Sequence, residues 1–223
     1  MKSNFKKALF VFGILFLLLF VSYKAFFYFD KKEEQFQVSK NKSNIRLTRS
    51  DINKLQEGDI ILRRGYGYFS DMIADHLNTK GFDVTHAGIL TKKNNHWFVI
   101  HSLSSDVSEI DGMQIQKLKD FLKYSQPNKI IVSRFKKATE NQRKEIATEA
   151  QKLLDLKIPF DHKGDIEDAS KMYCTEMIWY ILENQLQLAQ IPKEKKAREV
   201  FFYSMKCMYD TTYFDLVINK YKD

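Results

Sequence analysis

The sequence contains little cysteine, proline or glycine. Its 223 residues include two cysteines, three prolines and eight glycines. Two cysteines are too few for the disulfide framework that holds small secreted proteins together. So little proline and glycine also excludes a collagen-like or low-complexity chain. With 44% hydrophobic and 29% charged residues, the composition is instead that of a folded globular protein.

The chain is basic, but it shows no motif for binding nucleic acid. Its formal net charge is +8, and the lysines are spread along the sequence rather than gathered in one arginine-rich element. A basic surface can attract nucleic acid, anionic lipid or an acidic polymer. Because no recognisable reading motif accompanies the charge, we expect a solvated basic surface and no nucleic-acid partner.

An apolar segment near the N-terminus predicts a membrane anchor. Three lysines within the first seven residues precede an apolar run from Ala8 to Phe29, which is interrupted only at 22–24. A helix of about 20 apolar residues spans a bilayer, and positive charge before such a run keeps the N-terminus in the cytoplasm. The bulky residues at the end of the run offer no small-residue cleavage site. Residues 1–30 therefore favour an uncleaved signal-anchor, with a cleaved signal or a cytoplasmic domain as alternatives.

The rest of the chain is expected to form a tether and one domain. Residues 31–48, rich in Lys, Asn, Gln and Ser, have the composition of a polar tether. Residues 49–223 are enough for a single domain with a substantial core. With the anchor oriented as above, this domain is extracytoplasmic, in a bacterial cell envelope.

Hydrophobic periodicity in the domain predicts a mixture of strands and helices. A capping box at Thr139 and Gln142 marks the start of one of the helices. The expected strands cover residues 60–62, 84–90, 97–101 and 130–132, and the expected helices cover 69–77, 118–122, 142–156 and 174–184. The tail, 193–223, is expected to close the domain with a helix or a strand.

Two histidines lie in the arms of one predicted hairpin, whose turn falls at 92–95. If the turn is centred between Lys93 and Asn94, His86 stands directly opposite His101. Directly opposed residues have Cβ atoms about 4.5–5.5 Å apart, and a turn shifted by one position would make the pair diagonal. Each histidine alone could be a half-buried structural residue. Because paired titratable groups point to chemistry more than to packing, we predict that the pair is functional.

Cys174 stands at the start of a predicted helix, where it could act as a nucleophile. The N–H groups and the dipole of a helix N-terminus stabilise a thiolate and lower its pKa. Two structural interpretations compete with this one. Met177 and Ile178 place Cys174 on the apolar face of the helix, where cysteine is commonly buried, and a disulfide with Cys207 would remove the thiol altogether.

The three residues fit the parts of a thiol hydrolase. In this hypothesis Cys174 attacks a carbonyl carbon, His86 takes the thiol proton and returns it to the leaving group, and His101 orients His86. Two histidines and a cysteine could instead hold zinc with an open position. The sequence lacks a short-range ligand pair such as H-x-x-x-H, so we expect no metal and no cofactor. His76, His96 and His162 are expected to have no catalytic role.

Four segments of the domain resemble a known family when they are taken in order. They are similar to the permuted papain-like amidases, the YiiX/YaeF-like branch of the NlpC-type superfamily of cysteine peptidases and amidases. The histidine hairpin comes first and the cysteine helix last, the reverse of papain, and the resemblance covers about residues 55–182. The segments are Leu55–Leu62, Val84–Ile89, Ile158–Asp161 and Met172–Trp179.

The resemblance implies an α+β, circularly permuted papain-like fold, in which the cysteine helix packs against an antiparallel sheet that carries the histidine. It implies Cys174 as nucleophile and His86 as base. In relatives, a carboxylate or another polar residue can occupy the place of His101. Superfamily relatives cleave peptidoglycan peptide bonds or act on acyl–lipid bonds, so either substrate is expected here. A lipid acyltransferase and a non-catalytic, membrane-tethered binding module on the same fold remain alternatives.

Overall fold

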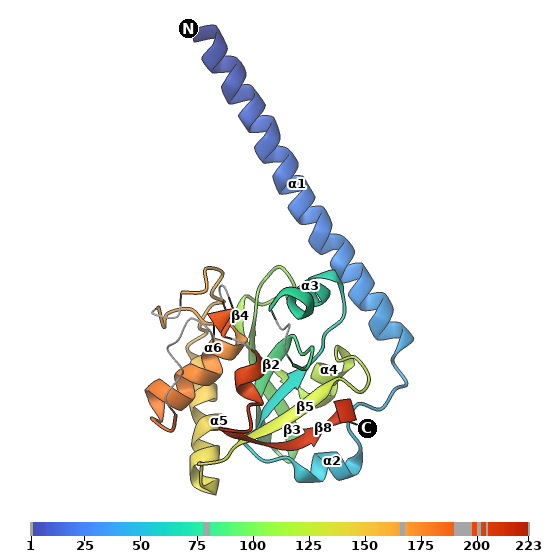
Figure 1. Cartoon of the computed structure of the whole chain (residues 1–223), viewed down its shortest axis with the longest axis vertical. Helices are drawn as coiled ribbons and strands as arrows, with labels where there is room; N and C mark the ends of the chain where they lie inside the picture. The colour runs from blue at the N-terminus through green and yellow to red at the C-terminus, as the bar shows by residue number, and fades with distance from the viewer. Residues whose placement is uncertain are drawn as a thin grey trace.

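The structure, a computed structural model, describes residues 2–77, 81–165, 168–189, 198–199, 202–203 and 205–222. Its centre is a six-stranded antiparallel sheet in the order β4-β3-β2-β1-β5-β8 (Figure 1). The strands are β1 (Ile60–Arg63), β2 (His86–Lys93), β3 (His96–Leu103), β4 (Gly112–Lys117), β5 (Ile130–Phe135) and β8 (Phe214–Asn219), with a separate pair formed by β6 (Arg198–Glu199) and β7 (Phe202–Tyr203).

Helices cover both faces of this sheet (Figure 1). A long N-terminal helix, α1 (Lys2–Lys40), leads into the domain. The other α-helices are α2 (Arg49–Lys54), α3 (Tyr68–Leu77), α4 (Leu118–Lys123), α5 (Glu140–Asp155) and α6 (Cys174–Trp179). Helix α6 continues as the π-helical turn η1 (Tyr180–Gln185). Two short 3₁₀ turns, η3 (Met205–Met208) and η4 (Lys220–Lys222), lie near the C-terminus.

The alternation of side chains along the strands divides the core into two layers. In β1, Ile60 and Leu62 join a large cluster with α5 and α6, while Ile61 joins a smaller cluster with α4 on the opposite face. The expected α+β fold, with an antiparallel sheet packed on helices, is confirmed. The predicted capping box is also present, since Thr139 Oγ1 accepts the N–H of Gln142 at 3.3 Å at the start of α5.

The strand β4 and the short helix α2 were not predicted. β4 alternates Met113 and Ile115 with glutamines, but this pattern covers few residues and only two of them are hydrophobic. It was therefore too weak to predict a strand. β4 pairs with β3 at one edge of the sheet. β8 pairs with β5 at the other edge, so the tail closes the domain with a strand, as one of the two predicted possibilities. Part of the tail and residues 78–80 of the predicted loop 78–83 lie outside the described residues.

A buried ion pair explains the first motif, Leu55–Leu62. Asp59 is completely buried, and its two carboxylate oxygens accept hydrogen bonds from Arg134 Nε at 2.7 Å and Nη2 at 2.9 Å. The same carboxylate accepts the N–H of Gln56 at 2.8 Å, which fixes the turn before β1. Gly58 in this turn has φ +80°, and a side chain there would collide with the carbonyl of Arg143.

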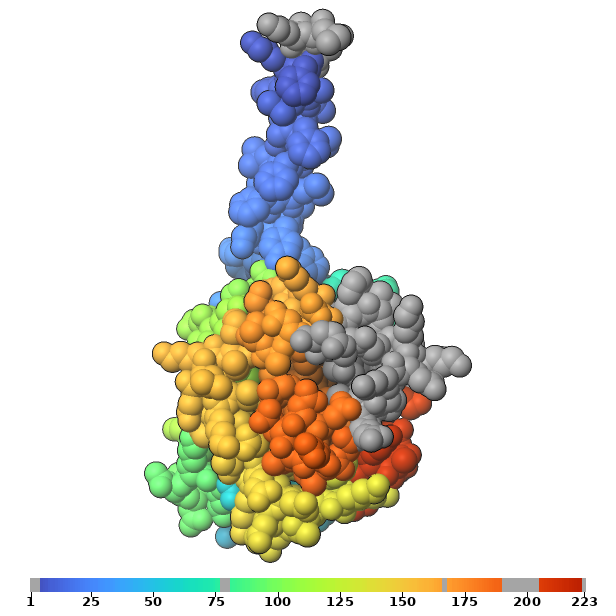
Figure 2. Space-filling model, turned by 90° about the vertical axis from the view of Figure 1, so that its left-hand side faces the viewer, coloured from blue at the N-terminus to red at the C-terminus, as the bar shows by residue number. Residues whose placement is uncertain are grey.

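The long helix α1 stands clear of the domain over most of its length (Figure 2). It includes a stretch long and apolar enough to cross a membrane, the one such helix among the described residues. Residues 31–40, which we expected to be a tether, continue the helix to Lys40. An i,i+4 hydrogen bond of 2.7 Å from Gln37 to Glu33 supports this extension.

The lower part of α1 is docked on the domain at α3. The carboxylate of Asp30 accepts the N–H of Phe69 at 2.9 Å, at the start of α3, and Asp30 is itself buried. The ring of Phe27 lies 5.5 Å from the ring of Phe69, centroid to centroid. Gly67 approaches Asp30 so closely that a side chain at this position would collide with the carboxylate. The contact therefore fixes the helix to the domain instead of leaving a flexible joint.

Candidate active site

The hairpin that carries the two histidines has a register different from the predicted one. Its two central turn residues are Asn94 and Asn95, with φ of 49° and 64°. The pairs Ile89–Ile100 and Lys93–His96 follow from this turn. The centre lies one residue beyond the predicted one because a two-residue turn of this type needs positive φ at both central positions, which asparagine tolerates.

His86 and His101 are nevertheless in contact, as diagonal neighbours on one face of the sheet. His86 Nε2 lies 3.0 Å from His101 Nδ1, and the ring centroids are 5.0 Å apart at a steep angle. Both side chains are buried. Gly88 leaves the space for this approach, since a side chain there would collide with Val99 and press on His101 Cβ.

Both imidazoles are neutral near pH 7. Burial lowers the pKa of His101 to about 3, with a smaller contribution from the positive charge of Arg63. Burial also lowers the pKa of His86 well below its ordinary value, and the neighbouring His101 and Arg63 add to the effect. A neutral imidazole can accept a proton, so the electrostatics suit a base rather than a resting cation.

One choice of tautomers leaves His86 with a free acceptor nitrogen. If His86 donates its Nε2–H to His101 Nδ1, its own Nδ1 remains as the acceptor for a substrate or thiol proton. His101 Nε2 and Gln116 Oε1 of β4 are both buried without a hydrogen-bond partner among the described residues, and the side chain of Gln116 acts to raise the pKa of His101. Gln116 was not predicted because its strand was not.

Cys174 begins α6, as expected. The backbone N–H of Ala87, the residue after His86, acts to lower the pKa of the thiol, as do the N–H groups of Thr175 and Cys174 itself. Neither cysteine is in a disulfide, so the bridge between Cys174 and Cys207 is not formed.

The expected low pKa of this thiol is not what the structure shows. Burial raises the pKa of Cys174 to about 11, against the opposing effects of the three N–H donors and of Arg63. The helix N-terminus was a correct prediction, but desolvation of the thiolate outweighs it. The resting site therefore holds a thiol and two neutral imidazoles.

The remaining motif residues hold Cys174 in place. Ser102 Oγ donates to the carbonyl of Met172 at 2.6 Å, which ties the segment before the cysteine to β3. The N–H of Met172 donates to the carbonyl of Pro159 at 2.9 Å. Asp161 closes its own loop by accepting the N–H groups of Lys163 and Asp165 at 2.7 and 2.6 Å. The segment 158–161 therefore supports the cysteine helix.

Arg63 is a candidate site residue that the sequence analysis missed. It is the last residue of β1 and pairs with His86 across the ladder. Its guanidinium carbon lies 4.6 Å from the ring centroid of Phe121, and the rings of His86 and His101 also pack on Phe121, at 5.8 and 5.5 Å. The sequence signal that could have identified Arg63 is a charged residue at the end of an otherwise apolar strand.

The other three histidines lie elsewhere in hydrogen bonds or on the surface. His162 Nε2 lies 3.0 Å from Asp111 Oδ1, His76 Nδ1 lies 3.1 Å from the carbonyl of Met72, and His96 is exposed at the hairpin tip. Within the described part of the chain, no three His, Cys, Asp or Glu residues are arranged to hold a metal ion. A groove of about 1160 Å³ runs between the end of α1 and α4, and the predicted catalytic residues do not line it.

Comparisons with known proteins agree with this fold. The chain is similar to a crystal structure described as metalloprotein yiiX from Escherichia coli O157:H7, with a TM-score of 0.58 and 20% identity over 74% of this chain and 98% of that one. At this identity the likeness shows the fold alone. No curated protein sequence matches. A family model described as permuted papain-like amidase enzyme, YaeF/YiiX, C92 family, matches residues 54–214. The chain therefore belongs to this family of permuted papain-like cysteine amidases.

Proposed function

We propose that the protein hydrolyses an amide bond through a thioester on Cys174, with His86 as base and His101 as its positioning residue. One observation carries the assignment. The N–H of Ala87 acts on the thiol of Cys174, and the side chain of the preceding residue, His86, lies 3.0 Å from His101. These contacts support a nucleophile, a base and a positioning residue that work together at the N-terminus of α6.

The steps follow from the protonation states. As Cys174 Sγ attacks the carbonyl carbon, His86 Nδ1 takes the thiol proton, and the C–N bond breaks when His86 gives this proton to the leaving amine. Water then attacks the thioester carbon, loses a proton to His86, and the thiol returns as the acid leaves. Because burial disfavours a resting thiolate, proton transfer accompanies the attack. The N–H groups around Cys174 are available for the developing oxyanion.

The location proposed for this chemistry is the extracytoplasmic face of a bacterial membrane, with α1 as an uncleaved anchor. The lysines before the apolar run support this orientation. At this location both an amide of the cell wall peptide and an acylated lipid lie in the same compartment as the domain. A C-terminal alkaline phosphatase fusion tests the orientation, because it is active only if the domain leaves the cytoplasm.

Hydrolysis itself is tested with the full chain in detergent or in vesicles. N-acyl amino acids and short wall peptides are incubated with the protein, and the released acid and amine are measured by mass spectrometry. Cys174→Ser is expected to abolish release and His86→Ala to lower it by at least about 100-fold, whereas Cys207→Ser, the matched control at the other cysteine, is expected to retain it. Release that persists in Cys174→Ser would contradict the proposal. Adding an alcohol or lysolipid acceptor reveals whether the acyl group is transferred instead of hydrolysed.

A further inference from the structure

Arg63 is a buried cation that forms no ion pair within 4.0 Å among the described residues. Its side chain is 6% exposed, and its Nε and Nη1 make no hydrogen bond in the described part of the structure. The guanidinium lies over the rings of Phe121 and Tyr124, at 4.6 and 5.8 Å. Aromatic faces attract a cation, but they do not satisfy its N–H donors. A buried charge left unpaired costs several kcal/mol, which points to an anion that occupies this place during function.

The anion would be close to the reacting groups. Arg63 pairs with His86 across the ladder, and its charge acts on Cys174, His86 and His101 alike. The carboxylate whose charge acts on Arg63 is Glu34 of α1. Glu34 is half-buried, and burial raises its pKa while Arg63 opposes the increase. The two form no ion pair within 4.0 Å among the described residues, so the guanidinium remains available.

The position of Glu34 on α1 relates the Arg63 site to a membrane surface. Glu34 follows Phe29, the last residue of the apolar run, by five residues, which is about 8 Å along a helix. The headgroup layer on each side of the hydrocarbon core is about 5–8 Å thick. With α1 upright in a bilayer, Glu34 therefore lies at the level where lipid headgroups carry their charge, and the charge of Arg63 acts on Glu34.

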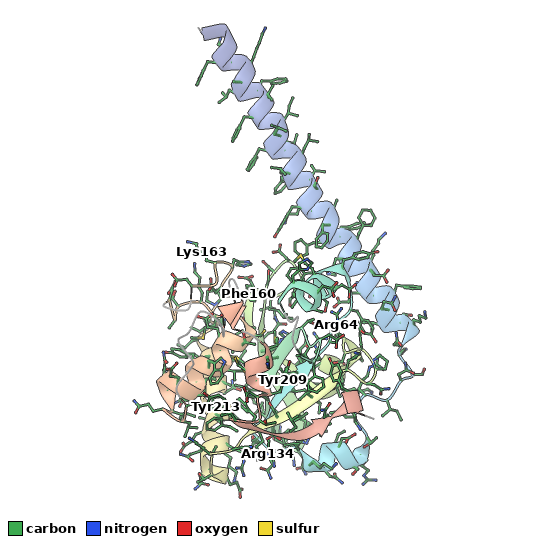
Figure 3. The ribbon with its side chains drawn as sticks, viewed as in Figure 1. Arg64, Arg134, Phe160, Lys163, Tyr209 and Tyr213 are labelled. Carbon is green, nitrogen blue, oxygen red and sulfur yellow. The ribbon has the colours of Figure 1, made fainter. Side chains whose placement is uncertain are left out.

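The docked helix prevents the site from moving away from this level. Asp30 bonds to Phe69 and Phe27 packs on it, four to seven residues before Glu34. Figure 3 shows Arg64, the residue after Arg63, beneath α3 on the side of the domain where α1 arrives. Tyr68 and Met72 of α3 expose about half of their surface. A tether would let the domain reach a distant wall polymer, whereas this arrangement keeps the site at the bilayer surface.

We propose that Arg63 binds the anionic group of a substrate that remains in the membrane, an N-acylated amphiphile with a carboxylate or phosphate beside its amide bond. This inference rests on the proposed function and decides its substrate class. The forked donors of arginine match both kinds of oxyanion. With the anion held by Arg63 and the acyl chain in the bilayer, the amide carbonyl is held near Cys174, and the substrate anion supplies the ion-pair partner that Glu34 does not.

The test uses the full chain in phosphatidylcholine vesicles and three probes. N-oleoylglycine carries the carboxylate, N-oleoylglycinamide has the same size without the charge, and N-acetylglycine keeps the charge but leaves the membrane. Binding is measured with the Cys174→Ser variant, and turnover with the wild type. Each is repeated with Arg63→Gln, with Arg63→Lys and with Lys163→Gln, a control at an exposed lysine on the side from which α1 projects (Figure 3).

The proposal predicts at least about tenfold preference for N-oleoylglycine over both other probes, in binding and in kcat/KM. Arg63→Gln is expected to bring the preference for N-oleoylglycine over N-oleoylglycinamide, in affinity and in kcat/KM, close to one. Arg63→Lys is expected to keep part of this preference, and Lys163→Gln to leave it unchanged. A preference that persists in a folded Arg63→Gln protein would overturn the role of Arg63. If N-acetylglycine is bound and hydrolysed as well as N-oleoylglycine, the claim that the substrate remains in the membrane is wrong. Selective binding without any turnover would leave the recognition standing and refute the proposed hydrolysis.

Discussion

The ring of His86 is joined to the ring of His101 through Nε2 and Nδ1 at 3.0 Å, although the two residues are diagonal rather than opposite in their hairpin. The contact depends on Gly88, which gives the rings room to lean together. Because Nε2 of His86 takes part in this contact, Nδ1 is the ring nitrogen left for Cys174 in the proposed mechanism. In that mechanism, His101 is expected to act on catalysis through His86 and not by touching the substrate.

The first prediction concerns this positioning role. His101→Ala is expected to lower kcat by at least about tenfold, and His86→Ala by about 10²–10⁴-fold, the usual contribution of a general base. His101→Asn offers an oxygen near the position of Nδ1 and is expected to recover part of the loss. The measurement is kcat and its pH profile in the three variants.

A purely structural role for His101 would give a different result. Asparagine would then recover stability without recovering kcat, and the pH profile of the surviving activity would not change. Thermal unfolding of each variant separates the two cases.

The second prediction concerns the reactivity of the free thiol. Because burial raises the pKa of Cys174 to about 11, alkylation by iodoacetamide is expected to be slow at pH 7 and to increase steeply above pH 9. Arg63→Gln removes a charge that favours the thiolate and is expected to move the profile to still higher pH. Peptide mass mapping distinguishes Cys174 from Cys207. Fast alkylation of Cys174 at pH 6 would contradict the protonation state proposed for the resting site.

The sequence predicted where the three candidate residues lie in the secondary structure better than it predicted their exact geometry. Cys174 at a helix start and two histidines in one hairpin follow from local patterns, which need no knowledge of the fold. The exact register did not follow, because the conformations of Asn94 and Asn95 place the turn centre one residue further on. The pKa of Cys174 could not be predicted either, since burial depends on how α6 packs on β2 and β3.

Long-range contacts explain the remaining omissions. Arg63 can be recognised as a candidate site residue only once β1 is known to pair with β2 and Phe121 to pack against the guanidinium. The composition of residues 31–40 is typical of a tether, yet the segment is helical. Its helix is continuous with the apolar run and is held by Asp30 on Phe69. In each case tertiary packing decides what local composition leaves open.

The third prediction concerns the buried ion pair beneath the first motif. Asp59→Ala leaves Arg134 without its carboxylate and is expected to destabilise the fold by about 3–5 kcal/mol. Glu140, which lies 2.8 Å from Lys144 on the exposed face of α5, is the matched control. Its change to alanine is expected to have little effect on stability. Urea unfolding of the detergent-solubilised chain measures both, and equal losses would show that the Asp59 pair contributes no more than a surface pair.

The fourth prediction concerns pH and the carboxyl group of Glu176. This side chain accepts the N–H of Tyr173 at 3.2 Å, and burial raises its pKa from 4.5 to about 8, helped by Asp161 and Asp165. The folded state therefore holds a proton that the unfolded state has released, and stability is expected to fall as pH rises from about 5 to 8. Glu176→Gln keeps an acceptor and removes this titration. If the wild type and Glu176→Gln lose equal stability between pH 5 and 8, the buried carboxyl group is not the cause.

Trapping the acyl-enzyme tests the central claim most directly. The full chain is incubated with an activated acyl ester, quenched in acid and examined by intact and peptide mass spectrometry. The account predicts one acyl group on Cys174 that hydroxylamine removes, little or none in His86→Ala, and none on Cys207. An acyl group on another residue, or an unmodified Cys174 in a protein that still turns over substrate, would contradict the thioester mechanism and the assignment of Cys174 as nucleophile.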